Sequence, residues 1–109
     1  MVWSSPIQLD SKYSASVPGE KGLYEIGYYR NDHFNPQYLG MSESSMQERF
    51  QAQARGEGNI GAADYLESAK RNNLYFRWQR HANPAKAEHD WLKEHGHGDG
   101  TKYPWNKRS

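Results

Sequence analysis

Aromatic side chains must supply most of the core of this chain. Four Trp, eight Tyr and three Phe make up 14% of its 109 residues, whereas all hydrophobic residues together make up only 35%. Globular domains usually contain about 45–50% apolar residues, glycine included. Large rings with a polar edge can build a thin core and still reach water. The length is that of one domain, so we predict a single folded unit and exclude a large two-domain enzyme.

The absence of cysteine narrows the possible chemistry. Without a thiol the chain has no disulfide framework, no thiolate zinc site and no cysteine nucleophile. Its apolar runs are only a few residues long, too short for a membrane span or a secretory signal. We therefore expect a soluble, intracellular protein of the cytoplasm with no membrane partner.

Three segments have the composition of β-strands. The first begins at Gly22 and is separated by a polar break from a second at residues 37–40. This pattern predicts a hairpin with a long, protruding loop over residues 30–36. Residues 74–80 alternate between apolar and polar side chains, which predicts a third, half-exposed strand.

Three helices follow from capping residues and helical spacing. The first begins after Ser45, which has Glu48 at capping-box spacing. A second helical pattern covers residues 61–72. The third helix is predicted over residues 84–95, because Asn83 provides an N-cap and a proline occupies the first helical position.

The order of these elements defines the expected fold. The sequence predicts an α/β (α+β) domain of order β-β-α-α-β-α, with a three-stranded, mainly antiparallel sheet flanked by about three helices. Residues 1–21 are rich in Ser, Pro and Lys, so we expect them to form an arm that lies on the domain. The domain itself is assigned to residues 22–109, with the large side chains near its end packing back onto it.

Positive charge is concentrated in the second part of the chain. Residues 1–69 carry five basic and nine acidic side chains, a net charge of −4, and residues 70–109 carry nine basic and four acidic ones, a net charge of +5. Aromatic residues are interleaved with a run of cations that no acidic residue interrupts, namely Lys70, Arg71, Arg77, Arg80 and Lys86. This pattern suits a polyphosphate partner, and it equally suits a strand whose charges are simply solvated.

Two charged residues occupy unusual positions on predicted helices. Glu88 lies three residues before Trp91 and four before Leu92, on the face that must be buried. Burial without a partner would cost several kcal/mol, so the carboxylate either has a partner, such as an Arg or a metal, or reaches water at the rim. Arg49 borders the apolar stripe of the first helix and could neutralise Glu88 or hold a phosphate.

Two short triplets connect these residues to a known family. The chain contains Gly22-Leu23-Tyr24 and, after thirteen intervening residues, Tyr38-Leu39-Gly40, followed by Arg49, Glu88 and Asn106. In this order the residues resemble the GIY-YIG nuclease domain superfamily, and the resemblance covers nearly the whole chain from Gly22. It implies a small fold with a central three-stranded antiparallel sheet, the arrangement also reached from periodicity.

The resemblance implies a phosphodiesterase site that cleaves DNA. Tyr24 and Tyr38 would project into one pocket and activate water, although a phenol with a pKa near 10 needs help to act as a base. Arg49 would bind the scissile phosphate. Glu88 would bind a divalent cation, Mg²⁺ or Mn²⁺, as its single protein carboxylate. Asn106 would orient the tail or touch the site and is grouped with the nucleic-acid-binding residues.

Departures from the family pattern leave alternatives open. Some relatives carry a His one turn after the helix arginine, where this chain has Gln53, which cannot exchange protons. The alternative to a nuclease is a catalytically silent or partner-dependent nucleic-acid-binding module of the same fold. No targeting domain is apparent, so specificity is expected from the arm, the hairpin loop, a homodimer or a targeting partner protein.

Overall fold

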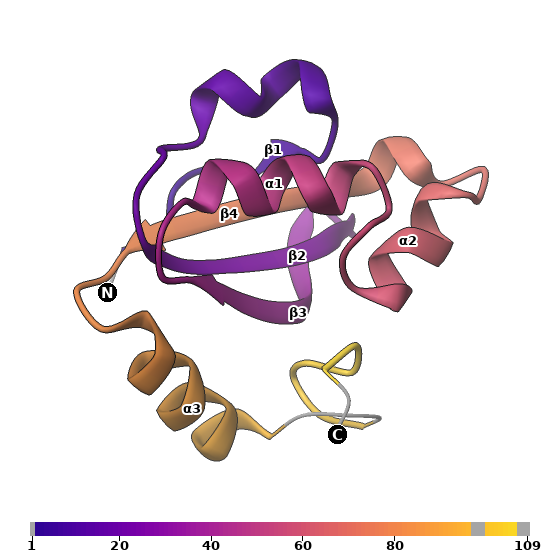
Figure 1. Cartoon of the computed structure of the whole chain (residues 1–109). Helices are drawn as coiled ribbons and strands as arrows, with labels where there is room; N and C mark the ends of the chain where they lie inside the picture. The colour runs from indigo at the N-terminus through magenta and orange to yellow at the C-terminus, as the bar shows by residue number, and fades with distance from the viewer. Residues whose placement is uncertain (1, 97–99, 107–109) are drawn as a thin grey trace.

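The computed structural model describes residues 2–96 and 100–106, and within them the chain forms an α+β fold (Figure 1). In chain order its elements are β1 (Ile7–Gln8), the 3-10 helix η1 (Ser11–Ser16), β2 (Gly22–Arg30), β3 (His33–Ser42), α1 (Met46–Ala54), α2 (Ile60–Leu66), the 3-10 helix η2 (Arg71–Asn73), β4 (Leu74–Arg80) and α3 (Pro84–His95). The order β-β-α-α-β-α predicted from residue 22 onward is confirmed.

The sheet has four strands, so the prediction of three was wrong. Its strand order is β1-β4-β2-β3, and every neighbouring pair is antiparallel. The additional strand comes from the arm, where Ile7 lies opposite Phe76. A strand of two residues has no alternation to detect in the sequence. It forms because the exposed edge of β4 offers unpaired backbone groups, and the Leu9 N–H donates to the Leu74 carbonyl at 2.8 Å.

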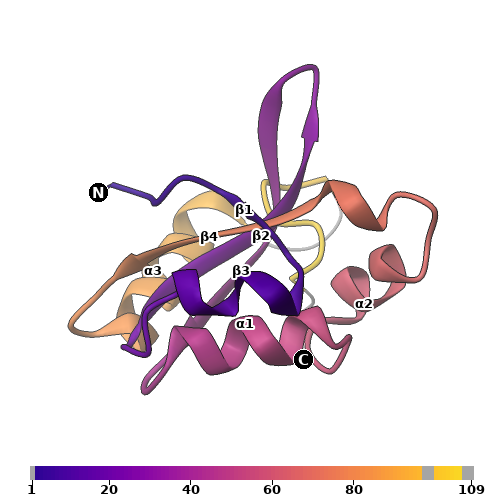
Figure 2. The same cartoon turned by 90° about the horizontal axis from the view of Figure 1, so that it is seen from above.

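The β2–β3 hairpin ends in a tight turn rather than a long loop. Only Asn31 and Asp32 lie between the strands, and both have positive φ angles, of 54° and 63°. Asn and Asp tolerate this conformation better than other non-glycine residues, and a two-residue turn of this kind matches the twist of the strands. The loop predicted over residues 30–36 was therefore wrong, and paired strands rise from the sheet in its place (Figure 2).

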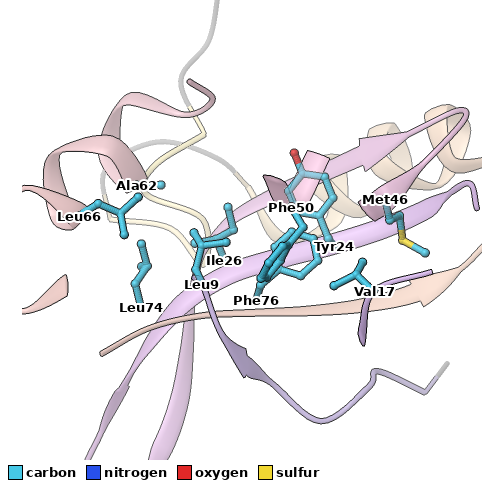
Figure 3. Close-up of a cluster of buried hydrophobic side chains, with 10 residues drawn as sticks. All are labelled: Leu9, Val17, Tyr24, Ile26, Met46, Phe50, Ala62, Leu66, Leu74 and Phe76. Atoms are coloured by element: carbon cyan, nitrogen blue, oxygen red, sulfur yellow. The ribbon is translucent and has the colours of Figure 1, made fainter. Parts of the chain in front are cut away.

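Helices cover both faces of the sheet. α1 and α2 lie on one side and α3 on the other (Figure 1). Strand alternation directs Tyr24 and Ile26 of β2 toward α1 and α2, and directs Leu23 and Glu25 toward the opposite face. The main core fills the space beneath α1 and α2 (Figure 3). It consists of Leu9, Val17, Tyr24, Ile26, Met46, Phe50, Ala62, Leu66, Leu74 and Phe76.

The helix ends mostly follow the predicted caps. The Ser45 side chain accepts from the Glu48 N–H, and the Asn83 side chain accepts from the Lys86 N–H. α2 is shorter than the segment 61–72 that periodicity favoured. It ends at Leu66, and two residues later the Ser68 hydroxyl donates to the Tyr65 carbonyl and accepts from the Lys70 N–H. These local hydrogen bonds compete with continuation of the helix.

The tail packs back onto the sheet, as predicted. Tyr103 is fully buried. The Trp105 N–H donates to the Gln37 carbonyl at 2.8 Å, which attaches the tail to the edge of β3. Among the helices described, none is both long and apolar enough to cross a membrane.

Candidate active site

The two triplet tyrosines lie side by side on one face of the sheet. Tyr24 comes from β2 and Tyr38 from β3, with ring centroids 6.1 Å apart. Tyr24 is directly opposite Gly40, and its ring lies so close to the backbone there that a Cβ at position 40 would overlap it. On its other flank the ring stacks on Phe76 at 4.8 Å. Gly40 is thus required for the phenol to cross the edge strand.

Gln53 of α1 fixes the hydrogen bonding of Tyr24. The Gln53 Oε1 accepts from the Asn59 backbone N–H at 2.9 Å, and the Gln53 Nε2 donates to the Tyr24 hydroxyl at 3.2 Å. A backbone N–H can only donate, so the amide orientation is determined. Tyr24 therefore accepts from Gln53 and keeps its own proton for donation into the site.

Both phenols favour their neutral form. Burial raises the pKa of Tyr24, and the neighbouring Tyr38 raises it further. Burial also raises the pKa of Tyr38, with a second upward contribution from the Glu88 charge. Arg49 lowers the pKa of both hydroxyls, but by less than burial raises them. At neutral pH both tyrosines are hydrogen-bond donors.

Arg49 and Glu88 bring opposite charges to the same place. Arg49 lies on α1 and is exposed, and Glu88 lies on α3 and is half-buried. The charge of each residue acts on the pKa of both tyrosines. The charges of Arg49 and Glu88, from two helices on opposite sides of the sheet, thus both reach the two neighbouring phenols of β2 and β3.

Glu88 has the features of a carboxylate available to a ligand. Among residues 2–96 and 100–106 it makes neither a hydrogen bond nor an ion pair, with Arg49 or any other residue. Partial burial raises its pKa. The described part of the chain contains no cluster of three or more His, Cys, Asp or Glu side chains suited to a metal. An oxygen-preferring cation at Glu88 would therefore take its other ligands from water and substrate.

The predicted nucleic-acid-binding cations do not form one surface. Lys70 and Arg71 are exposed next to the start of β4, while Arg77 forms an ion pair with Glu25 on the opposite face of the sheet from Tyr24. The Arg77 guanidinium also lies 5.1 Å from the ring of Trp3 and 4.6 Å from that of Phe34. The last two cations form exposed ion pairs, Arg80 with Glu20 at 2.8 Å and Lys86 with Asp90 at 2.6 Å.

Asn106 lies beside the site and positions the tail. Its Oδ1 accepts from the Leu39 N–H at 2.8 Å and its Nδ2 donates to the Leu39 carbonyl at 2.9 Å. The amide thus makes with Leu39, between Tyr38 and Gly40, the two hydrogen bonds that a neighbouring β-strand would make. Both polar atoms of the amide are engaged by the backbone.

Two residues support the site, and the sequence had assigned Asn59 at most a minor positioning role. Asn59 caps α2 by accepting from the Ala62 N–H and donates through its Nδ2 to the Trp105 carbonyl at 3.0 Å. Gln53 was considered only as the residue that stands where some relatives have a histidine. An Asn followed by a helical pattern is a recognisable N-cap signal, but the contact between Gln53 and Tyr24 joins residues 29 positions apart and has no local signature.

Alkaline pH should destabilise the fold through its buried tyrosines. The folded-state pKa values of Tyr24 and Tyr103 are raised by burial. Below pH 10 the folded and unfolded chains are both protonated, so the stabilisation is complete. Above pH 10 the unfolded chain loses protons that the folded chain retains, and the free energy of unfolding falls by about 1.4 kcal/mol per tyrosine at pH 11.

Urea denaturation at pH 8 and pH 11 measures this effect. Tyr24→Phe should remove about half of the pH dependence that Tyr24 and Tyr103 contribute together. If the variant and the wild type lost the same free energy between the two pH values, the hydroxyl of Tyr24 would not be the buried acid described above.

Comparison with known proteins yields no relative: no family model, curated protein or solved structure matches the chain. The resemblance carried by the two Gly/Tyr triplets therefore depends on the residues themselves. The contact between Tyr24 and Tyr38, and the effect of the Arg49 and Glu88 charges on both phenols, are the observations that bear most directly on function.

Proposed function

We propose that the chain is a divalent-metal-dependent endonuclease of the GIY-YIG type that hydrolyses DNA phosphodiester bonds. The observation that carries this proposal is that two neighbouring phenols lie within the influence of one guanidinium and one unpaired carboxylate, each from a different helix. Hydrolysis of a phosphodiester requires a positioned water, stabilisation of the phosphoryl oxygens and charge neutralisation. Each requirement has a candidate side chain in this site.

Arg49 has the role of binding the scissile phosphate. Its guanidinium is exposed and forms no ion pair within the described residues. A planar fork of N–H donors matches two phosphoryl oxygens, and its positive charge opposes the negative charge that accumulates during attack.

The two tyrosines have different roles. Tyr38 is half-buried and faces an open groove, so its oxygen is the one that can contact the attacking water and, in the ionised phenolate form, accept a proton from it. Tyr24 is only 2% exposed and is held by Gln53. It acts as a positioning residue that donates toward Tyr38 and the site. Arg49 favours ionisation of both phenols.

Glu88 is the residue that would hold the cation. A half-buried carboxylate without a protein partner fits one hard divalent ion such as Mg²⁺ or Mn²⁺. When bound, the cation would supply Lewis-acid polarisation of a phosphoryl oxygen and would offset the negative charge of Glu88.

Nicking of supercoiled plasmid tests the proposed activity. The purified chain should convert the plasmid to a nicked form in the presence of Mg²⁺ or Mn²⁺ and should leave it intact in EDTA. The appearance of linear product would show whether a second copy supplies a second cut. A plasmid that stays supercoiled with both cations would contradict the proposal.

Replacement of Tyr38 by phenylalanine should slow cleavage by about 100-fold, because the variant cannot form the phenolate that accepts the proton from water. The single-turnover rate of the wild type should rise with pH between 6 and 9, since the raised pKa of Tyr38 keeps its base form scarce there. The variant should lose this rise. Tyr13→Phe, an exposed tyrosine of η1, is the matched control and should behave as the wild type.

Gln53 favours a second candidate function, a nucleic-acid-binding module without catalysis. It lies between Tyr24 and Asn59 with both polar atoms engaged, and it offers no proton-transfer group. In this case the chain would bind DNA with an affinity that falls as salt rises and would not nick plasmid at any pH.

A further inference from the structure

A groove made up of three adjoining hollows leads away from Tyr38 along α2. Its first part, of about 750 Å³, is bounded by Tyr38, Asn59 and Trp105. A second part of about 480 Å³ shares Asp64 and Trp105 with the first. A third part of about 570 Å³ continues from Tyr65 and Lys70 to the hairpin. The groove therefore runs from Tyr38, a side chain of the candidate active site, toward the turn end of the β2–β3 hairpin.

Three aromatic rings follow one another along this groove. The ring of Trp105 lies 5.9 Å from that of Tyr65, and the ring of Tyr65 lies 5.6 Å from that of Tyr28. All three side chains are half-buried, so part of each ring is accessible. They come from the tail, α2 and β2, and their row forms only in the folded chain. Tyr28 and Tyr65 are stacked on each other, and Tyr65 and Trp105 also pack against the core, so unpaired bases would stack on the parts of these rings that remain exposed in the groove.

The groove is flanked by two cations that are available for phosphates. Lys70 and Arg30 line its distal part, both side chains are exposed, and neither forms an ion pair within the described part of the chain. Asp64 is the acidic residue among the lining side chains and lies nearer to Tyr38. Positive charge is thus greatest at the end farthest from the candidate active site.

We propose that this groove binds a single-stranded segment of the DNA substrate and leads it toward Tyr38. The inference rests on the proposed function and adds a substrate class, DNA with an unpaired strand next to the cleavage position. Aromatic rings in a concave groove favour a single strand, because the bases of a duplex are already stacked on each other and are not free to occupy it. The exposed cations complement the strand's backbone.

Fluorescence anisotropy with the Glu88→Gln protein tests this proposal without cleavage. The probes are a labelled 12-nucleotide single strand and the duplex of the same sequence. The single strand should bind more tightly, by about ten-fold. Lys70→Gln should reduce the dependence of log affinity on log salt by about one. Tyr65→Leu should weaken single-strand binding by about ten-fold.

Lys93→Gln, an exposed lysine of α3, is the matched control and should leave single-strand binding unchanged. Because Lys70 is exposed, its variant is not expected to unfold, so an unchanged affinity and salt slope would overturn the proposal. Equal or tighter binding of the duplex would also overturn it. If Lys70→Gln weakened self-association in sedimentation experiments and left DNA binding intact, the groove would be an interface between copies, which likewise contradicts a DNA track.

Failure of this inference differs from failure of the proposed function. If the chain nicks plasmid with Mg²⁺ but does not prefer single strands, it is a nuclease whose groove does not bind a single-stranded segment of the substrate. If the chain prefers single strands through Lys70 and Tyr65 but leaves plasmid intact, the groove binds single-stranded DNA but the proposed catalysis is wrong.

Discussion

Replacement of Arg49 by alanine should lower the single-turnover rate of plasmid cleavage by about 100- to 1000-fold. This is the usual consequence of removing one donor that stabilises charge in a transition state. Arg49 is exposed, and its charge acts on both Tyr24 and Tyr38, so its removal affects catalysis more than folding. A quenched time course with excess protein over plasmid measures the rate.

Arg55→Ala is the matched control for this variant. Arg55 terminates the same helix and forms an exposed ion pair with Glu57 at 2.9 Å. Its replacement also removes one positive charge but should change the rate by less than about three-fold, since exposed pairs contribute little. If both variants lost the same activity, Arg49 would act only through net charge, which contradicts its assigned role at the phosphate.

The largest expected effect on stability comes from Arg77→Met. Arg77 is paired with Glu25, whose side chain is fully buried. The same carboxylate accepts from the Tyr103 hydroxyl, and the Tyr103 oxygen in turn accepts from the Trp91 Nε1 at 2.6 Å. Without the guanidinium, Glu25 would remain buried with a single donor. We expect the free energy of unfolding to fall by about 3 kcal/mol, because an uncompensated buried charge is costly.

Arg80→Met is the control that distinguishes loss of the ion-pair partner of buried Glu25 from loss of any positive charge on β4. Arg80 lies three residues away on the same strand, and its ion pair with Glu20 is exposed. Its replacement should lower the free energy of unfolding by less than about 1 kcal/mol. Urea denaturation of the two variants measures both values. Equal losses would show that Glu25 does not depend on Arg77 in the folded chain.

Local signals in the sequence were sufficient for much of the fold. The N-caps Ser45 and Asn83 and the alternation of residues 74–80 predicted α1, α3 and β4 closely. These features depend on hydrogen bonds and side-chain periods within a few residues of chain. Burial of Tyr103 also followed from its size and apolar character alone.

Features that depend on distant parts of the chain were missed. The pairing of Ile7 with Phe76 joins residues 69 positions apart, and a two-residue strand carries no pattern. Arg77 was grouped with the DNA-binding cations because its neighbours in sequence are basic. Its partner Glu25 lies on the adjacent strand, directly opposite in the register, and only the pairing of β2 with β4 reveals the ion pair.

For the candidate site, the sequence singled out four candidate side chains but not their environment. The triplets and helix positions singled out Tyr24, Tyr38, Arg49 and Glu88, and the fold brings them together. The burial that raises the tyrosine pKa values and the amide of Gln53 that orients Tyr24 arise from tertiary packing.

The central claim is that Glu88 and its neighbours form one metal-dependent phosphodiesterase site. The most direct test compares single-turnover nicking of supercoiled plasmid by the wild type and by Glu88→Gln over a range of Mg²⁺ concentrations. Glu94→Gln, an exposed carboxylate of the same helix, is the control. We predict saturable Mg²⁺ dependence for the wild type and the control, and a rate about 100-fold lower for Glu88→Gln. Equal rates for the wild type and Glu88→Gln, or no nicking by either, would contradict the claim.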